Sequence, residues 1–144
     1  MQSLPMADAA LTEKAKQQIM RTVADRQLVG AANNVKWNKL LTHMREREDW
    51  VPSYRWKSVE GYISGWDVEW HYHLPFPFVG VEWFDIGVHQ TIPVGRLVDD
   101  KIIDHSVWIV PLLESIRFDF EKKSDVVRIW GYLPKCYEDF PPKD

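Results

Sequence analysis

The sequence predicts an α+β fold in which an antiparallel sheet of about four to five strands carries helices on one face. Three observations lead to this prediction: two helical periodicities open the chain, two hairpin-like alternations follow, and a third helical pattern lies between the hairpins. This order of elements is typical of antiparallel α+β domains. With 144 residues, 45% hydrophobic and 27% charged, the chain is expected to form a single domain over residues 1–144.

The first predicted helix covers residues 12–28, because one apolar stripe repeats every four residues along it. The stripe consists of Leu11, Ala15, Ile19 and Val23. Gly30 provides a natural end, since glycine readily adopts the backbone conformation that terminates helices. A stripe this narrow predicts a helix at the edge of the domain or in contact with a second copy of the chain. We therefore expect residues 1–32 to be a peripheral segment.

A second helix is predicted to begin at Asn33 or Asn34, whose side chain can accept hydrogen bonds from first-turn N–H groups. Its apolar positions follow the i, i+3, i+4, i+7 pattern and are Trp37, Leu40, Leu41 and Met44. Pro52 prevents the helix from continuing. Residues 54–57 then alternate aromatic and basic side chains, which predicts a short edge strand guarded by charge.

The first hairpin is predicted from a strand over residues 67–74, a turn at 75–77 and a returning strand over 79–88. In the first of these strands, apolar and ionisable residues alternate, so the strand should have one packed and one accessible face. The packed face would hold Val68, Trp70, Tyr72 and Leu74, and the accessible face Asp67, Glu69, His71 and His73. A second hairpin is predicted from strands over residues 117–121 and 126–132.

Residues 90–101 join the two hairpins and contain proline, glycine and paired aspartates, which predicts a surface loop. Asp104 can then cap a third helix through about Ser115, although a strand over residues 107–110 is an alternative. The proline-containing tail over residues 134–144 is predicted to be extended. These elements leave an α+β core over residues 33–133, with the sheet face opposite the helices at least partly open.

Composition narrows the cellular setting and the partners. The single cysteine, Cys136, cannot form an internal disulfide, which favours a reducing compartment. We expect a cytoplasmic protein without a membrane partner, because no apolar run approaches the ~20 residues of a membrane helix. Residues 1–60 carry ten Lys/Arg against seven Asp/Glu, whereas residues 61–144 carry eight against fourteen. This acidic second part favours a basic protein partner over nucleic acid.

The densest group of aromatic and ionisable residues lies between positions 62 and 85, and it is our candidate binding site. Trp and Tyr supply rigid contact area, and carboxylates supply charge that complements a basic partner. The candidate site residues are Trp66, Asp67, Glu69, His71, His73 and Glu82. The sequence therefore favours a protein-binding domain over an enzyme, and no cofactor is expected.

Two alternatives use residues of the same region. His71 and His73 lie two apart on the predicted strand, so they could bind a metal ion in a hydrolase with Glu69 or Glu82 as general base. Single-stranded nucleic acid could stack on the segment 54–57, but the net charge of −3 disfavours it. No nucleophile elbow or glycine-rich phosphate loop is present in the sequence.

Four tryptophan-containing motifs extend these expectations. They read N-N-V-K-W, G-Y-I-S-G-W-D-V-E-W-H-Y-H, V-E-W-F-D-I and R-I-W-G-Y, in this order between residues 33 and 133. Together they resemble a family of small bacterial domains of unknown function. Small, acidic, tryptophan-rich α+β proteins also resemble immunity proteins of toxin systems, and this likeness implies a protein that neutralises a partner.

Overall fold

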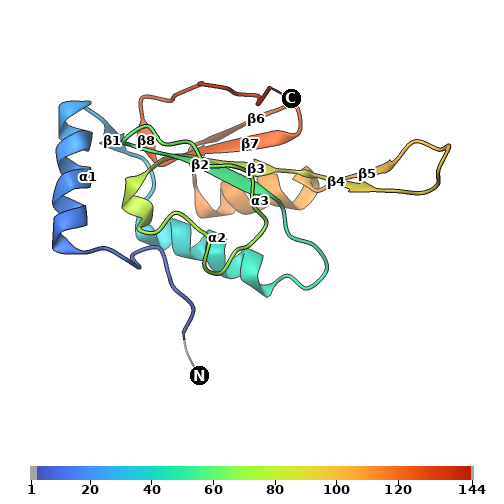
Figure 1. Cartoon of the computed structure of the whole chain (residues 1–144), viewed down its shortest axis with the longest axis horizontal. Helices are drawn as coiled ribbons and strands as arrows, with labels where there is room; N and C mark the ends of the chain where they lie inside the picture. Colours follow the sequence, from blue (N-terminus) through green and yellow to red (C-terminus); the bar gives the residue numbers. More distant parts are fainter. Residues whose placement is uncertain (1–2, 144) are drawn as a thin grey trace.

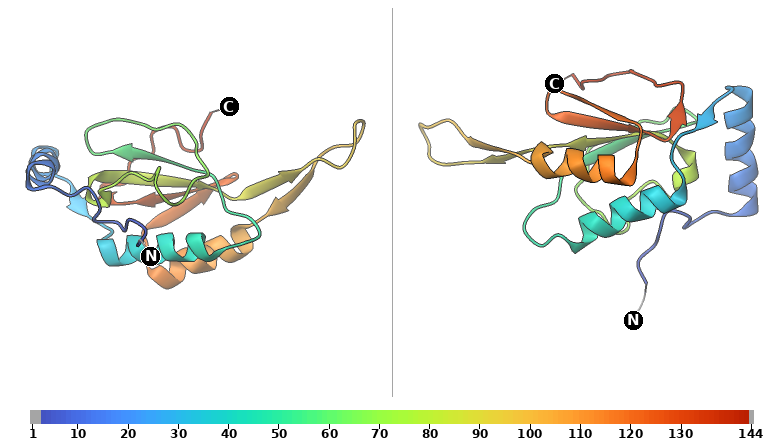
Figure 2. Two further views of the ribbon diagram at one scale, coloured as in Figure 1. Left: turned by 60° about the horizontal axis from the view of Figure 1, so that its bottom comes forward. Right: turned by 180° about the vertical axis from the view of Figure 1, so that it is seen from behind.

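A computed structural model describes residues 3–143 and confirms the α+β fold (Figure 1). The main sheet has the strand order β2-β3-β7-β6, and all neighbouring strands are antiparallel. The strands are β2 (Tyr54–Ser58), β3 (Val81–Gly87), β7 (Val126–Trp130) and β6 (Phe120–Lys123). Helices α2 (Asn34–Glu46) and α3 (Ser106–Ile116) cover one face of this sheet (Figure 2). The predicted edge strand is confirmed, because β2 lies at one end of the strand order.

The main core lies between these helices and the sheet. The side chain of Asn33 accepts a hydrogen bond from the Lys36 N–H, so it caps α2 as predicted. The four apolar residues of the predicted stripe are all buried. Trp37 is central, because its ring lies 5.1 Å from that of Phe78 and 5.0 Å from that of Phe118. This core explains why α2 forms where its periodicity predicts.

Helix α1 (Glu13–Asp25) lies at the end of the sheet (Figure 1). Thr12 caps this helix by accepting a hydrogen bond from the Ala15 N–H, and the helix buries its own residues Ile19 and Val23. Strand β1 (Val29–Gly30) follows α1, and strand β8 (Tyr132–Leu133) follows β7. These two short strands pair with each other. The N-terminal helix is thus bound to the body by a strand pair as well as by its apolar side.

The predicted strand over residues 67–74 is wrong, since these residues form an irregular loop. Trp70 and Leu74 are buried, but Val68 and Tyr72 are exposed, so the predicted packed face does not form. The physical reason is that two carboxylates of this stretch bind backbone N–H groups, which competes with a strand. The turn that follows contains a short 3₁₀ helix, η1 (Phe78–Gly80), which leads directly into β3.

The predicted loop over residues 90–101 is also wrong, because its two ends pair as strands. Strand β4 (His89–Ile92) and strand β5 (Lys101–Asp104) form a separate antiparallel hairpin. We call residues 89–104 the arm, since this hairpin projects away from the main sheet (Figures 1 and 2). β-branched residues favour the pairing, in which Thr91 lies opposite Ile102. Helix α3, rather than the alternative strand, follows the arm.

The second face of the sheet is covered, which corrects the expectation of an open aromatic face. The C-terminal tail runs back across it on the side opposite α2 and α3 (Figures 1 and 2). Phe140 of the tail is buried and packs with Trp83, Val126 and Trp130 of the sheet. The indole N–H of Trp130 donates to the Cys136 carbonyl over 3.0 Å. The tail is therefore an integral part of the hydrophobic core.

Beneath the tail lies a buried ionic network centred on Asp85, which is 0% exposed. Arg128 donates from Nε to Asp85 Oδ1 (2.7 Å) and from Nη2 to Oδ2 (2.9 Å). Arg55 donates from Nε to the same Oδ2 (3.0 Å). The tail completes the network, because Asp139 accepts from Arg55 (2.9 Å) and the Glu138 carbonyl accepts from Arg128 (2.7 Å). The network fastens the tail to three strands.

Replacing Asp85 by alanine should lower the free energy of unfolding by about 3–5 kcal/mol, because two buried guanidinium groups would lose their shared partner. Urea unfolding followed by circular dichroism measures this change. The matched control is Asp49→Ala, which removes an exposed ion pair with Arg47 and should lower the stability far less, because surface ion pairs contribute little. Equal losses in the two variants would show that the buried network does not stabilise the fold.

Candidate binding surface

Residues 66–73 form a loop that is held in shape by its own carboxylates, and we call it the braced loop. Asp67 Oδ1 accepts from the N–H groups of Val68 (2.7 Å) and Glu69 (3.0 Å). Glu69 Oε1 accepts from three consecutive N–H groups at distances of 2.7–2.9 Å, those of His71, Tyr72 and His73. Consecutive N–H groups that converge on an anion form a nest, and here the chain supplies the anion itself.

The pKa values of both carboxyl groups reflect this bonding. Burial acts to raise the pKa of Glu69, but the backbone N–H bonds from His73, Tyr72 and His71 outweigh it and lower the pKa below its ordinary value. Burial also acts to raise the pKa of Asp67, but the backbone N–H bonds and the neighbouring His73 together lower it below its ordinary value. Both groups are thus ionised in their bracing role at neutral pH.

The braced loop presents apolar side chains to solvent. Trp66 is 44% exposed, Val68 61% and Tyr72 63%. Between them, Trp70 points inward, where its indole N–H donates to the Pro52 carbonyl over 2.9 Å. The hydroxyl of the buried Tyr54 donates to the Glu69 carbonyl and ties the loop to β2. The braced loop therefore presents exposed apolar side chains on a backbone that its own hydrogen bonds hold in place.

The structure brings together five of the six predicted site residues. Trp66, Asp67, Glu69, His71 and His73 all lie in the braced loop. The second oxygen of Asp67 lies 2.9 Å from Nδ1 of His73, and that of Glu69 lies 3.9 Å from Nδ1 of His71. Both histidines therefore have a carboxylate neighbour on the exposed side of the loop.

Glu82 does not belong to this surface. It is 1% exposed, and its two oxygens accept from Arg26, just after α1, at 2.7 and 2.9 Å. Lys57 also lies 3.8 Å from its carboxylate. Glu82 therefore joins α1 to the sheet, a role that depends on a residue 56 positions away and leaves no local signal in the sequence.

Of the two alternative sites, the histidine pair lies in the braced loop and the segment 54–57 lies in β2. Within residues 3–143, no group of three or more His, Cys, Asp and Glu side chains is placed to hold a metal ion, so His71 and His73 have no third ligand there. In the segment 54–57, Tyr54 and Arg55 are buried, so they cannot serve as a platform on which bases stack.

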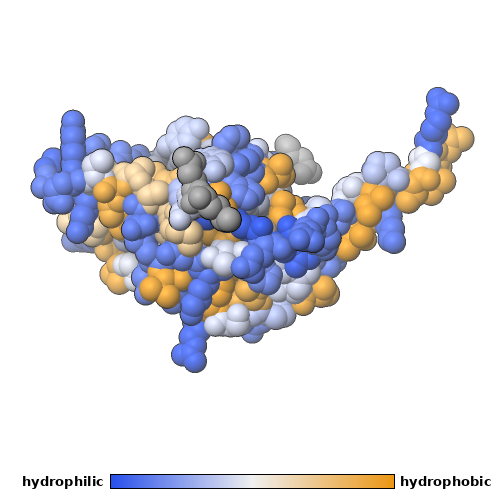
Figure 3. Space-filling model, turned by 90° about the horizontal axis from the view of Figure 1, so that it is seen from below, coloured by the Kyte–Doolittle hydropathy of each residue, from blue (hydrophilic) through white to orange (hydrophobic). Residues whose placement is uncertain are grey.

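The arm is a second exposed surface, which sequence reasoning missed. Leu97 at its tip is 100% exposed, and hydrophobic residues continue along the arm (Figure 3). The other exposed apolar residues of the arm are Val94, Val98 and Ile102. The sequence feature that could have predicted this surface is the apolar content of a segment expected to be a surface loop. Exposed apolar patches commonly mark interaction sites.

His105 fixes the base of the arm. Its Nδ1 accepts from the Trp108 indole N–H (2.8 Å), and its Nε2 lies 2.8 Å from Oε1 of Gln90 on β4. Trp50 stacks on the imidazole, with ring centroids 3.9 Å apart. Burial lowers the pKa of His105, and the nearby Arg47 cation lowers it further. A neutral imidazole that accepts at Nδ1 and donates at Nε2 satisfies both bonds.

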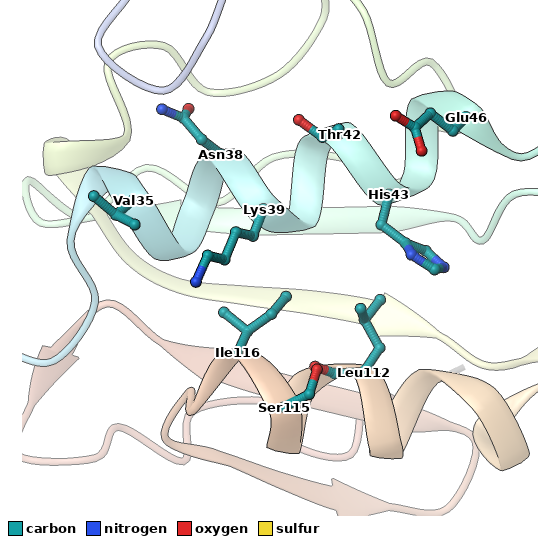
Figure 4. A pocket seen from close by; sticks show the side chains of 9 residues that line it. All are labelled: Val35, Asn38, Lys39, Thr42, His43, Glu46, Leu112, Ser115 and Ile116. Atoms are coloured by element: carbon teal, nitrogen blue, oxygen red, sulfur yellow. The ribbon is translucent and has the colours of Figure 1, made fainter.

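An open groove of 580 Å³ runs between α2 and α3 (Figure 4). Val35 of α2 and Leu112 and Ile116 of α3 give it an apolar character, and Lys39 of α2 points toward α3 (Figure 4). The groove arises from the packing of two helices that are distant in the sequence. Its shape suits an apolar group, but its residues specify no reaction.

The fold and these surfaces define a class of protein: a small antiparallel α+β domain with a braced loop and a projecting arm. The chain belongs to the family described as "Family of unknown function (DUF6678)", which matches residues 19–136. This match confirms the resemblance to a family of unknown function that the tryptophan motifs indicate. No curated protein and no solved structure matches the chain. Among the helices within residues 3–143, none has the length and hydrophobicity of a membrane-spanning segment.

Removing the Glu69 carboxylate should free the braced loop. Glu69→Ala leaves three N–H groups to water, so their hydrogen exchange should accelerate at least about tenfold and stability should fall by about 1–2 kcal/mol. Because the folded-state pKa is lowered, the same contribution in the wild type is present above the unfolded pKa of about 4.3 and is lost as the pH falls through the folded value. Glu48→Ala, at an exposed position, is the control. Unchanged exchange at residues 71–73 would contradict the bracing role.

Acidification should weaken the fold through His105. Its folded-state pKa lies below the unfolded value of about 6.5, so its contribution to stability is present above that pH and is lost as the pH falls. Unfolding free energies at pH 7.5 and 5.5 should therefore differ more in the wild type than in His105→Phe, which keeps a stacking ring but does not titrate. An identical pH dependence in both proteins would exclude His105 as a source.

Proposed function

We propose that this domain is a protein-binding module that neutralises a partner, as immunity proteins and antitoxins do, and that it binds through the braced loop. One observation carries the proposal: Trp66, Val68 and Tyr72 are exposed on a loop whose backbone is fixed by five N–H bonds to its own carboxylates. Ordering a flexible loop costs binding free energy, and a pre-ordered loop avoids this cost. Exposed aromatic side chains are the residues that most often dominate binding interfaces.

The charge of the braced loop indicates what kind of surface the proposed partner should have. Asp67 and Glu69 each use one oxygen to brace the loop and keep the other beside a histidine. Their negative charge favours a basic surface on the partner. Replacing either residue would also disturb the loop itself, so loss of binding in such variants would not separate contact from folding. Tyr72 is the better probe, since its side chain contributes no hydrogen bond within the described residues.

The arm offers a second contact surface for the same function. Its fully exposed Leu97 lies at the end of a two-stranded hairpin, and such hairpins are marginally stable alone. A partner that covers the arm would bury its apolar side chains and stabilise it. An experiment on this function therefore has to probe the loop and the arm separately.

Site-specific photo-crosslinking in the native host tests the proposal. The photoreactive residue p-benzoylphenylalanine is placed at Tyr72, at Leu97, or at Val29, which matches Tyr72 in exposure at 64% against 63%. We expect one discrete crosslinked protein from Tyr72 and none from Val29. With that partner purified, Tyr72→Ala should weaken the Kd at least about tenfold, and Val29→Ala should leave it unchanged.

The possible results distinguish an error in the proposed binding surface from an error in the proposed function. A partner captured only at Leu97 would retain protein binding but move the contact from the braced loop to the arm. A product of twice the chain's mass would identify a second copy and replace neutralisation by self-association. No discrete product at either Tyr72 or Leu97 would overturn the proposed function.

A further inference from the structure

A small aromatic pocket lies where β2, the turn after it and the segment before η1 meet. Trp56 of β2, Tyr62 of the turn and Phe76 line it, and Ile19 of α1 lies at its side. We call this site the aromatic pocket. Its volume is 240 Å³, which is below the range of about 300–1,000 Å³ typical of drug-sized ligands. The pocket thus suits a compact group.

The aromatic walls of the pocket are held in place. The rings of Trp56 and Tyr62 form a corner, with centroids 5.3 Å apart and planes inclined at 52°. The turn between them is fixed because the Ser58 N–H donates to the Tyr62 carbonyl (2.9 Å). Phe76 packs edge-on against the buried Phe78, with ring centroids 5.8 Å apart. The walls are therefore ordered before any ligand binds.

The charge of the pocket is negative. Among the described residues that line it, Glu60 is the only one with a charged side chain at neutral pH. Arg26 is not a lining residue; it donates to the Val59 carbonyl (2.6 Å), and the same guanidinium is paired with Glu82. The carboxylate of Glu60 thus has no competing cation among the lining residues.

From this geometry we propose that the aromatic pocket binds a methylated ammonium group, through the faces of Trp56, Tyr62 and Phe76 with Glu60 at the rim. A methylated ammonium carries diffuse positive charge, which the negative faces of aromatic rings attract, and its methyl groups fill apolar space. An uncharged apolar group would leave Glu60 without a role. The chemistry fits a small choline-like molecule and a trimethylated lysine equally, and it is independent of the proposed function of the braced loop.

The test is an NMR titration of the full-length ¹⁵N-labelled protein, observed at the eight tryptophan indole N–H signals. Trp56→Phe assigns the signal of Trp56, and the buried Trp37 and Trp83 serve as internal controls. The ligands are choline, its uncharged isostere 3,3-dimethylbutan-1-ol, and a trimethyl-lysine peptide with its unmodified form. We expect choline to shift the Trp56 signal with a Kd at least about tenfold lower than that of the isostere.

Variants assign the binding to the pocket. Tyr62 is exposed, so Tyr62→Ala should keep the fold and weaken binding at least about fivefold. Glu60→Gln should weaken it about threefold, whereas Glu114→Gln, on an exposed position of α3, should have no effect. Tighter binding of the trimethyl-lysine peptide than of choline would identify a modified protein as the source, and the reverse a small molecule. No shift at millimolar ligand, or equal affinity for the isostere or for unmodified lysine, would overturn the proposal.

Discussion

The fold depends on one buried carboxylate, that of Asp85, shared between two arginines. Arg55, Asp85 and Arg128 lie directly opposite one another on β2, β3 and β7, so antiparallel register creates a row of alternating charge. Such a row is costly to remove from water unless every polar atom is paired. The C-terminal tail supplies the remaining acceptors, including the Asp139 carboxylate, and at the same time covers Trp83 and Trp130. The tail therefore joins the ionic row to the hydrophobic contacts of Phe140 with Trp83, Val126 and Trp130.

Two further carboxylates organise the structure in the same way. Glu82 binds the guanidinium of Arg26, which joins α1 to β3, and Glu69 binds three backbone N–H groups in the braced loop. In this protein, carboxylates next to tryptophans in the sequence organise structure. The surface left for contact is consequently apolar and aromatic, while the negative charge lies beside it.

Rigid supports underlie each exposed surface. The base of the arm is held by His105, which bonds to β4 and to α3 at once, while the tip projects away from the body (Figure 1). The braced loop rests on Trp70 and Tyr54, and the aromatic pocket on β2 and Phe78. The braced loop and the aromatic pocket are thus ordered before they bind, so little ordering entropy is lost on association.

The sequence alone determined the elements that depend on capping, periodicity and alternation within short segments. The Asn33 cap, the apolar stripe of α2, the edge strand at 54–57 and the second hairpin follow from capping, periodicity and alternation. Tertiary structure decided the burial of Glu82 and the covering of the sheet by the tail. The braced loop is held by bonds between near neighbours in the sequence, but alternation alone predicted a strand there. Alternation between apolar and ionisable residues cannot tell whether a carboxylate meets water, an arginine or a backbone N–H. That choice depends on groups far away in the chain, such as Arg26 beside Glu82 and Arg128 beside Asp85.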